Sequence, residues 1–128
     1  MNKKLKILGC IFGASAVIIG AFGAHGLDGK IDLESIKSFE TGVKYQMYHA
    51  LLLLILGFNL KPEAKFVQAM IYLFGIGIVL FSISIYLLAT NSLTPALDFR
   101  TIGFVTPIGG TLLIIGWILL LLSFIKEQ

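Results

Sequence analysis

The stretch FVQAMIYLFGIGIVLFSISIYLLA, residues 66–89, decides the fold of this chain. It carries no charged side chain along its whole length. A helix of about 20 predominantly apolar residues is long enough to cross the hydrocarbon layer of a bilayer, and a helix that is apolar on every side needs an apolar environment. Residues 66–89 are therefore predicted to form a membrane-spanning helix.

Similar stretches occur three more times, so that the predicted helices cover approximately residues 5–25, 42–60, 66–89 and 102–125. Of the 128 residues, 57% are hydrophobic and 13% are charged, and the mean hydropathy is +0.94. A soluble domain carries about 25% charged residues. We predict an all-α membrane protein: a single membrane domain over residues 1–128, folded as a bundle of four transmembrane helices.

The first predicted helix differs from a cleaved secretion signal. Its apolar stretch is longer than the roughly 7–15 residues of a signal core. Removal of this helix would leave three spans and put the two termini on opposite sides of the membrane. We therefore expect residues 5–25 to remain in the protein.

Basic residues lie at the ends of the predicted helices, and their distribution favours one orientation. With the N-terminus inside, the cytoplasmic segments carry Lys3, Lys4, Lys6, Lys61, Lys65 and Lys126, and the outer segments carry Lys30, Lys37, Lys44 and Arg100. Because basic residues favour the cytoplasmic side, we predict that both termini are cytoplasmic, in a multi-pass protein of the cell (plasma) membrane.

The net charge of +3 would suggest nucleic acid as the partner of a soluble protein. Here the basic residues are spread over the helix ends and form no single patch, which favours contact with lipid headgroups. We therefore expect membrane lipids, and not nucleic acid, as partners.

Small residues form a stripe along the first predicted helix. They are spaced by three or four positions: Gly9, Gly13, Ala16, Gly20 and Ala24. Such residues let helix backbones approach closely inside a membrane. The stripe has two interpretations, packing within one chain or a contact with a second copy or another membrane protein.

A proline lies inside the last predicted helix. Pro107 would remove the backbone hydrogen bond to Gly103 and disturb a helix interior. We therefore predict a helix kink formed by Thr106, Pro107, Gly109 and Gly110.

The helix predicted over residues 42–60 has two polar faces. At 100° per residue, Gly42, Tyr45, Gln46 and His49 share one face. Lipid would leave the polar atoms of this face unpaired, so we expect it to point into the bundle. Glu40 and Lys44 lie on the opposite side, where they can pair with each other.

A candidate polar binding cluster follows from these positions, because His25 stands at the outer end of the first helix. Its members are His25, Tyr45, Gln46 and His49. Three interpretations remain open: a hydrogen-bonded cluster that ties the helices together, a pocket for a lipid headgroup or small polar ligand, or a metal, haem or catalytic site. Two histidines without a close Cys, Asp or Glu are too few for a metal site. We therefore assign no metal, no cofactor and no catalytic residue.

Several motifs resemble one known group of proteins. They are residues 20–25 (GAFGAH), 41–51 (TGVKYQMYHAL), 80–89 (LFSISIYLLA) and 104–110 (FVTPIGG), followed by Gly116-Trp117. Together they are similar to the YgdD/YwdK-like small membrane proteins, a group of unknown function. The aligned residues are Gly20, Gly23, His25, Thr41, Gly42, Tyr45, Gln46, His49, Thr106, Pro107, Gly109, Gly110 and Trp117. Ile83 departs from the pattern, which often has glycine there.

The resemblance covers all four predicted spans. It implies four membrane spans and a plasma-membrane location, and it implies no activity. Function therefore has to be argued from the residues of this chain.

Three functions compete. We favour a non-catalytic integral membrane module that binds a lipid, a small ligand or a partner protein. The alternative is a small oligomeric transporter or channel, similar in size to the small multidrug exporters. Those proteins place a carboxylate in their first helix, whereas this chain has no acidic residue before Asp28. The third is a membrane enzyme or redox protein that uses His25 and His49.

Overall fold

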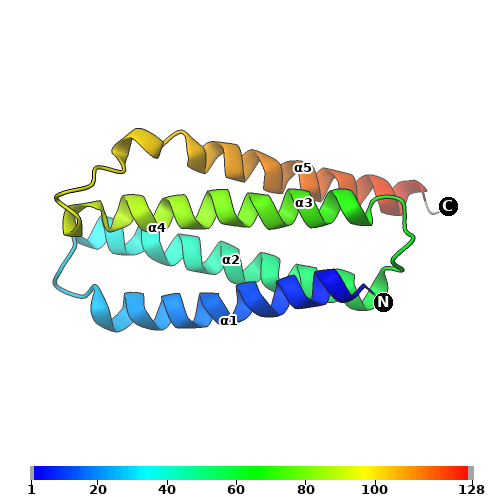
Figure 1. Ribbon diagram of the computed structural model, residues 1–128, viewed down its shortest axis with the longest axis horizontal. Helices are drawn as coiled ribbons and strands as arrows, with labels where there is room; N and C mark the ends of the chain where they lie inside the picture. Colours follow the sequence, from blue (N-terminus) through cyan, green and yellow to red (C-terminus); the bar gives the residue numbers. More distant parts are fainter. Residues whose placement is uncertain (1, 127–128) are drawn as a thin grey trace.

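A computed structural model describes residues 2–126 of the chain. Over this range the protein consists of four antiparallel helical rods (Figure 1). The first rod is α1 (Lys3–Gly26), the second is α2 (Leu33–Asn59) and the fourth is α5 (Val105–Lys126). The third rod is made of three consecutive elements, α3 (Val67–Ile78), the π-helix η1 (Val79–Ile83) and α4 (Ser84–Ala89). The described residues contain no strand, and the all-helical prediction is confirmed.

The rods run up and down in chain order, so both ends of the described chain lie at one end of the bundle. The backbone N–H of Asn2 donates to the carbonyl of Gly57, and the ammonium of Lys126 lies 5.7 Å from the ring centre of Phe66. The connection at the opposite end of the third rod contains two short 3₁₀ helices, η2 (Asn91–Leu93) and η3 (Arg100–Ile102).

Three of the rods are long and apolar enough to cross a membrane: α1, Val67–Ala89 and Arg100–Lys126. Their outward faces carry large apolar side chains, and Ile18 and Ile114 are each at least 60% exposed. The second rod, α2, has similar length, but Lys44, Gln46 and His49 lower its hydropathy. Exposed apolar surface of this extent suits contact with lipid.

Two helix boundaries differ from the predicted ones. The second rod begins at Leu33 and not near residue 42, because Ile36 and Phe39 of its first turns pack towards α1. The last rod begins as α5 at Val105, which places Pro107 in its first turn. A proline is tolerated there because the missing N–H would have no partner within the helix. Pro107 therefore lies in the first turn of α5, and it does not bend a helix interior as predicted.

Glycines set the closest approaches between rods. The stripe on α1 faces α2: a Cβ at Gly9 would lie 2.9 Å from the carbonyl oxygen of Ala50, and one at Gly20 would lie 3.1 Å from Val43. In α5, a Cβ at Gly109 would overlap the backbone nitrogen of Phe81 in η1. The α1 stripe is thus used for packing within the chain.

The core has two apolar parts. The larger one lies in the half of the bundle that holds the chain ends and includes Leu5, Leu53 and Phe74, whose side chains are fully buried. The smaller one, near the opposite end, contains Leu27, Phe39, Tyr86 and Ala89. Between them lies a layer of buried polar side chains.

Candidate functional site

Gln46 lies at the centre of the polar layer and joins three helices. Its side chain is 4% exposed. The amide Nε2 donates to the carbonyl oxygen of Phe12 at 2.9 Å and to Ser15 Oγ at 2.7 Å, both on α1. Its Oε1 accepts a hydrogen bond of 2.7 Å from the hydroxyl of Tyr86 on α4. Gln46 therefore fastens α2 to both neighbouring rods.

His49, one turn along α2, is also buried, and both of its ring nitrogens are engaged. Nδ1 lies 2.7 Å from the carbonyl oxygen of Tyr45. Because a carbonyl only accepts, Nδ1 must carry the proton. Nε2 is then free to accept, and Trp117 Nε1 on α5 donates to it at 3.1 Å. This arrangement describes a neutral imidazole with no lone pair left for a metal ion.

Serine hydroxyls complete the polar layer. Ser82 Oγ, in the π-helix η1, donates to the carbonyl oxygen of Gly42 on α2 at 2.8 Å. Ser84 Oγ lies 2.6 Å from Thr106 Oγ1 at the start of α5. Within residues 2–126, every buried side-chain nitrogen or oxygen has a hydrogen-bond partner. An inward polar face of this kind can tie four rods together without a ligand.

The four residues of the predicted polar cluster are divided between three environments. Gln46 and His49 lie inside the bundle, as their position on one helix face predicted. Tyr45 is 43% exposed. His25 is exposed in the last turn of α1, and no hydrogen bond of the described residues joins it to the other three. The structure therefore does not bring the two histidines together.

Sequence reasoning missed the partners of this cluster. Ser84, Tyr86 and Trp117 were noted only as parts of motifs, and no hydrogen bond to another helix was predicted for them. A signal was present, because Ser82, Ser84 and Tyr86 are polar residues in an otherwise apolar helix. Such residues in a span are expected to hydrogen-bond to another helix.

A hollow of about 240 Å³ opens on the outside of this polar layer. We call it the central groove. It lies between α2, η1 and α5 and is lined by Tyr45, His49, Phe81, Gly110, Leu113, Ile114 and Trp117. Two polar groups of its wall, the imidazole and the indole N–H, are bonded to each other, and the third, the Tyr45 hydroxyl, belongs to a side chain that is 43% exposed. The groove is thus built to receive an apolar group.

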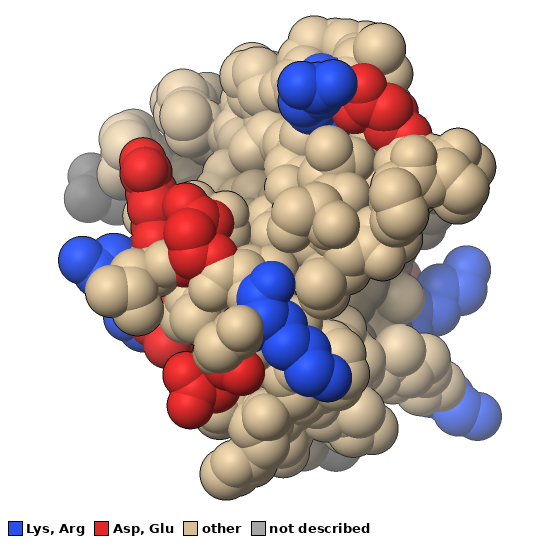
Figure 2. Space-filling model, turned by 90° about the vertical axis from the view of Figure 1, so that its left-hand side faces the viewer, with Lys and Arg blue, Asp and Glu red and all other residues tan. Residues whose placement is uncertain are grey.

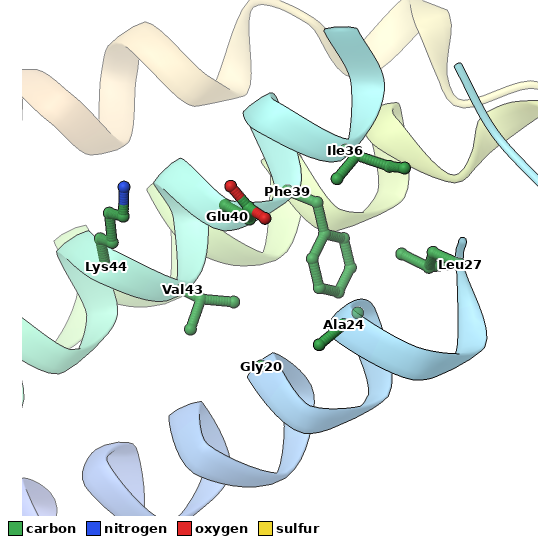
Figure 3. A pocket seen from close by; sticks show the side chains of 9 residues that line it. Gly20, Ala24, Leu27, Ile36, Phe39, Glu40, Val43 and Lys44 are labelled. Carbon is green, nitrogen blue, oxygen red and sulfur yellow. The ribbon is translucent and has the colours of Figure 1, made fainter. Parts of the chain in front are cut away.

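A second hollow, of about 170 Å³, lies between α1 and α2 towards the end opposite the chain ends (Figure 3). We call it the α1–α2 groove. Its lining is Gly20, Gly23, Ala24, Leu27, Ile36, Phe39, Glu40, Val43 and Lys44. Glu40 and Lys44 have the spacing at which they can pair, but the ion pair found among the described residues joins Asp98 and Arg100. The two groove charges therefore lie beside an apolar floor without a salt bridge between them.

The Asp98–Arg100 pair belongs to the connection before α5, at the end of the bundle seen in Figure 2. Arg100 Nη2 lies 2.9 Å from Asp98 Oδ2. Hydrogen bonds from the Arg100 side chain and backbone lower the pKa of Asp98 to about 2. Both side chains are exposed, so this pair is a solvated feature of the connection.

The antiparallel rods, the apolar outer surface and the sealed polar layer define a small helical membrane protein. The model of the family described as "Protein of unknown function (DUF423)" matches residues 19–110, and the chain belongs to this family. No solved structure matches the chain.

Relatives cover almost the whole chain. UPF0382 membrane protein SAB0533 of Staphylococcus aureus is 42% identical over 97% of this chain and 97% of its own length. UPF0382 membrane protein YwdK of Bacillus subtilis is 40% identical over 97% and 98%. A UPF0382 membrane protein of Haemophilus influenzae is 35% identical over 100% and 98%. The resemblance seen in the sequence motifs is confirmed, and so is the membrane class. The family carries no assigned function.

Proposed function

We propose that the chain crosses the cell membrane four times, with α2 as a span like the other three rods. With 27 residues, α2 is about 40 Å long, against a hydrocarbon core of about 30 Å. Its buried polar groups have partners inside the bundle, which removes the usual cost of polar residues in a span. Its outward residues Leu51, Ile55 and Phe58 are each more than half exposed and suit lipid contact.

We further propose that both termini are cytoplasmic. The end of the bundle that holds them also holds the basic residues Lys3, Lys4, Lys6, Lys61, Lys65 and Lys126. Such an accumulation favours the cytoplasmic side. A fluorescent protein fused after Gln128 should fluoresce in cells, whereas alkaline phosphatase at the same place should be inactive. An active phosphatase fusion would refute this orientation.

In function, the protein is a non-catalytic membrane module that binds the apolar part of a lipid or another small apolar molecule in the central groove. The observation that carries this proposal is the hydrogen bond between His49 and Trp117 in the groove wall. Because these groups satisfy each other, an apolar occupant that packs against them leaves neither of them unpaired. Tyr45, Phe81 and Trp117 supply aromatic walls for it.

The same hydrogen bond argues against histidine chemistry as the function. A general base or a metal ligand needs a free imidazole nitrogen. His49 would have to leave either Trp117 or the Tyr45 carbonyl before it could act. Membrane lipids are accordingly the proposed partners. The alternative is a homo-oligomer or a membrane-protein partner, which would appear as additional mass in the experiment below.

The test fills the groove with a side chain. A Cβ at Gly110 would lie 3.5 Å from the Phe81 ring, an ordinary contact, so Gly110→Leu should fold. Native mass spectrometry from mild detergent should find a retained apolar adduct on the wild type and several-fold less on Gly110→Leu. Thr111→Leu, which alters an exposed neighbour outside the groove lining, is the matched control.

A second readout comes from fluorescence, because Trp117 is the chain's single tryptophan. Phospholipids with brominated acyl chains should quench the wild type more than Gly110→Leu. Equal adducts and equal quenching in the two proteins would overturn the proposal, and a mass of two or more copies without adduct would favour the oligomer.

A further inference from the structure

The α1–α2 groove combines an apolar floor with two opposite charges. Its α1 side, which includes Gly20 and Ala24, carries little or no side chain (Figure 3). Phe39 and Val43 of α2 form the other wall. A chain of methylene groups could lie on such a surface without unpairing any polar atom.

Glu40 and Lys44 stand at the α2 side of this floor and are both exposed. They are four residues apart on one helix, the spacing at which an acid and a base can pair. No salt bridge joins them, since the ion pair of the described residues is Asp98–Arg100. Each charge is thus available to a group from outside the chain.

Glu40 and Lys44 lie at different depths along the bundle axis, and this order indicates which headgroup fits. The helix α2 enters the bundle from the end opposite the termini, so Lys44 lies about 6 Å deeper than Glu40. Glu40 itself lies about 10 Å from the start of α2, near the border between headgroups and hydrocarbon. The backbone of the basic residue therefore lies below that of the acidic one, and the Lys44 side chain extends outward to bring its ammonium to the headgroups.

A phosphatidylethanolamine molecule has the complementary order. Its phosphate is next to the glycerol and acyl chains, and its ammonium lies further out. The Lys44 ammonium would meet the phosphate, and the Glu40 carboxylate would accept hydrogen bonds from the lipid ammonium. A choline headgroup has no N–H to donate, and a glycerol headgroup has no positive charge.

We propose that the α1–α2 groove is a binding site for phosphatidylethanolamine in the leaflet at the bundle end opposite the termini. The upper part of an acyl chain and the glycerol lie on the glycine floor, and the headgroup bridges Lys44 and Glu40. This site is separate from the central groove and does not depend on it, since the two share no lining residue.

The test is competitive lipid retention. Purified full-length protein is exchanged into nanodiscs with equal amounts of phosphatidylethanolamine, phosphatidylcholine and phosphatidylglycerol, and the lipids retained after mild release are counted by native mass spectrometry. The wild type should retain phosphatidylethanolamine about fivefold over phosphatidylglycerol, the scale of one partly exposed charge pair. Glu40→Gln should abolish that preference.

Further variants distinguish the effect of a single charge from the effect of the order of the two charges along α2. Lys44→Gln should lower phospholipid retention about three- to fivefold, whereas Lys37→Gln, at an exposed lysine of α2 outside the groove, should leave it unchanged. The exchange Glu40→Lys with Lys44→Glu keeps the net charge and reverses the order, and should also lose the preference. Helical circular dichroism checks that each variant is folded.

Some outcomes would overturn the site. They are equal retention of the three lipids by the wild type, an unchanged preference in the reversed pair, or an equal loss in Lys37→Gln and Lys44→Gln. Gly110→Leu, which fills the central groove, should keep the preference for phosphatidylethanolamine. The experiments can therefore refute the proposal for one groove without affecting the proposal for the other.

Discussion

The inner and outer faces of α2 carry polar residues with opposite surroundings. Gln46 and His49 on the inner face are at most 7% exposed, and each makes hydrogen bonds to another rod. Glu40 and Lys44 on the outer face are exposed and make no salt bridge with each other. The four residues lie within ten positions of the sequence, on one continuous helix.

The difference shows that polar residues on one helix of the bundle can have two different roles. Hydropathy treats the two faces alike, and α2 does not pass as a candidate span on that measure. The two faces differ in whether their polar side chains have a hydrogen-bond or salt-bridge partner within the chain. Polar groups that are paired within the chain stabilise the bundle, while exposed charges without such a partner are open to groups from outside it.

The largest expected loss of stability comes from adding a bulky side chain at Gly42 on the inner face of α2. A Cβ at Gly42 would lie 2.8 Å from the Tyr86 ring. That ring is held by its bond to Gln46 and by Phe39, whose ring centre is 4.9 Å away. Gly42→Leu should cost about 3 kcal/mol of the free energy of unfolding, measured by titration with SDS. Its exposed neighbour Thr41→Leu should change it by less than about 0.5 kcal/mol, and equal losses would break the comparison.

A smaller loss should follow removal of the central hydrogen bonds. Gln46→Leu removes three of them and leaves the Tyr86 hydroxyl without its acceptor. At about 0.6 kcal/mol for each bond within a membrane, the loss should be near 2 kcal/mol. Lys44→Leu on the outer face should leave the free energy of unfolding nearly unchanged in the same SDS titration. If Lys44→Leu were the more damaging change, the outer face would have a structural role.

The hydrogen bond between Trp117 and His49 in the wall of the central groove should contribute less to the free energy of unfolding. Trp117→Phe keeps an aromatic ring and removes the N–H that His49 Nε2 accepts. A double-mutant cycle of Trp117→Phe with His49→Ala should give a coupling of about 0.6 kcal/mol. Additive losses in the two single variants would show that this hydrogen bond does not form in the folded protein.

The smallest effect is expected from a charge pair outside the membrane. Arg100 lowers the pKa of Asp98 from 3.8 to about 2. The pair therefore stabilises the fold above pH 3.8, and this stabilisation is lost as the pH falls towards 2. The difference in unfolding free energy between the wild type and Asp98→Asn should be small, because both groups are exposed, and should vanish below pH 2. A difference that grows with acid would contradict this sign.

Local features of the sequence predicted much of this arrangement. The helical regions follow from the length of the apolar stretches, and the inward position of Gln46 and His49 follows from helix periodicity. The start of α5 was misplaced because a proline fits the first turn of a helix as well as it disrupts an interior. The periodicity of apolar residues does not distinguish a proline in the first turn from one in the helix interior.

The sequence by itself determined that this chain forms apolar helices of membrane-spanning length, with two polar faces on the second. Both properties depend on neighbouring residues, through helix geometry and the cost of placing polar groups in lipid. Only the tertiary structure decided which polar groups are satisfied. Gln46 and Ser15 are 31 positions apart, and His49 and Trp117 are 68 apart. A hydrogen bond of about 3 Å between such positions depends on which helices become neighbours, and that is settled by the packing of small residues at the helix crossings.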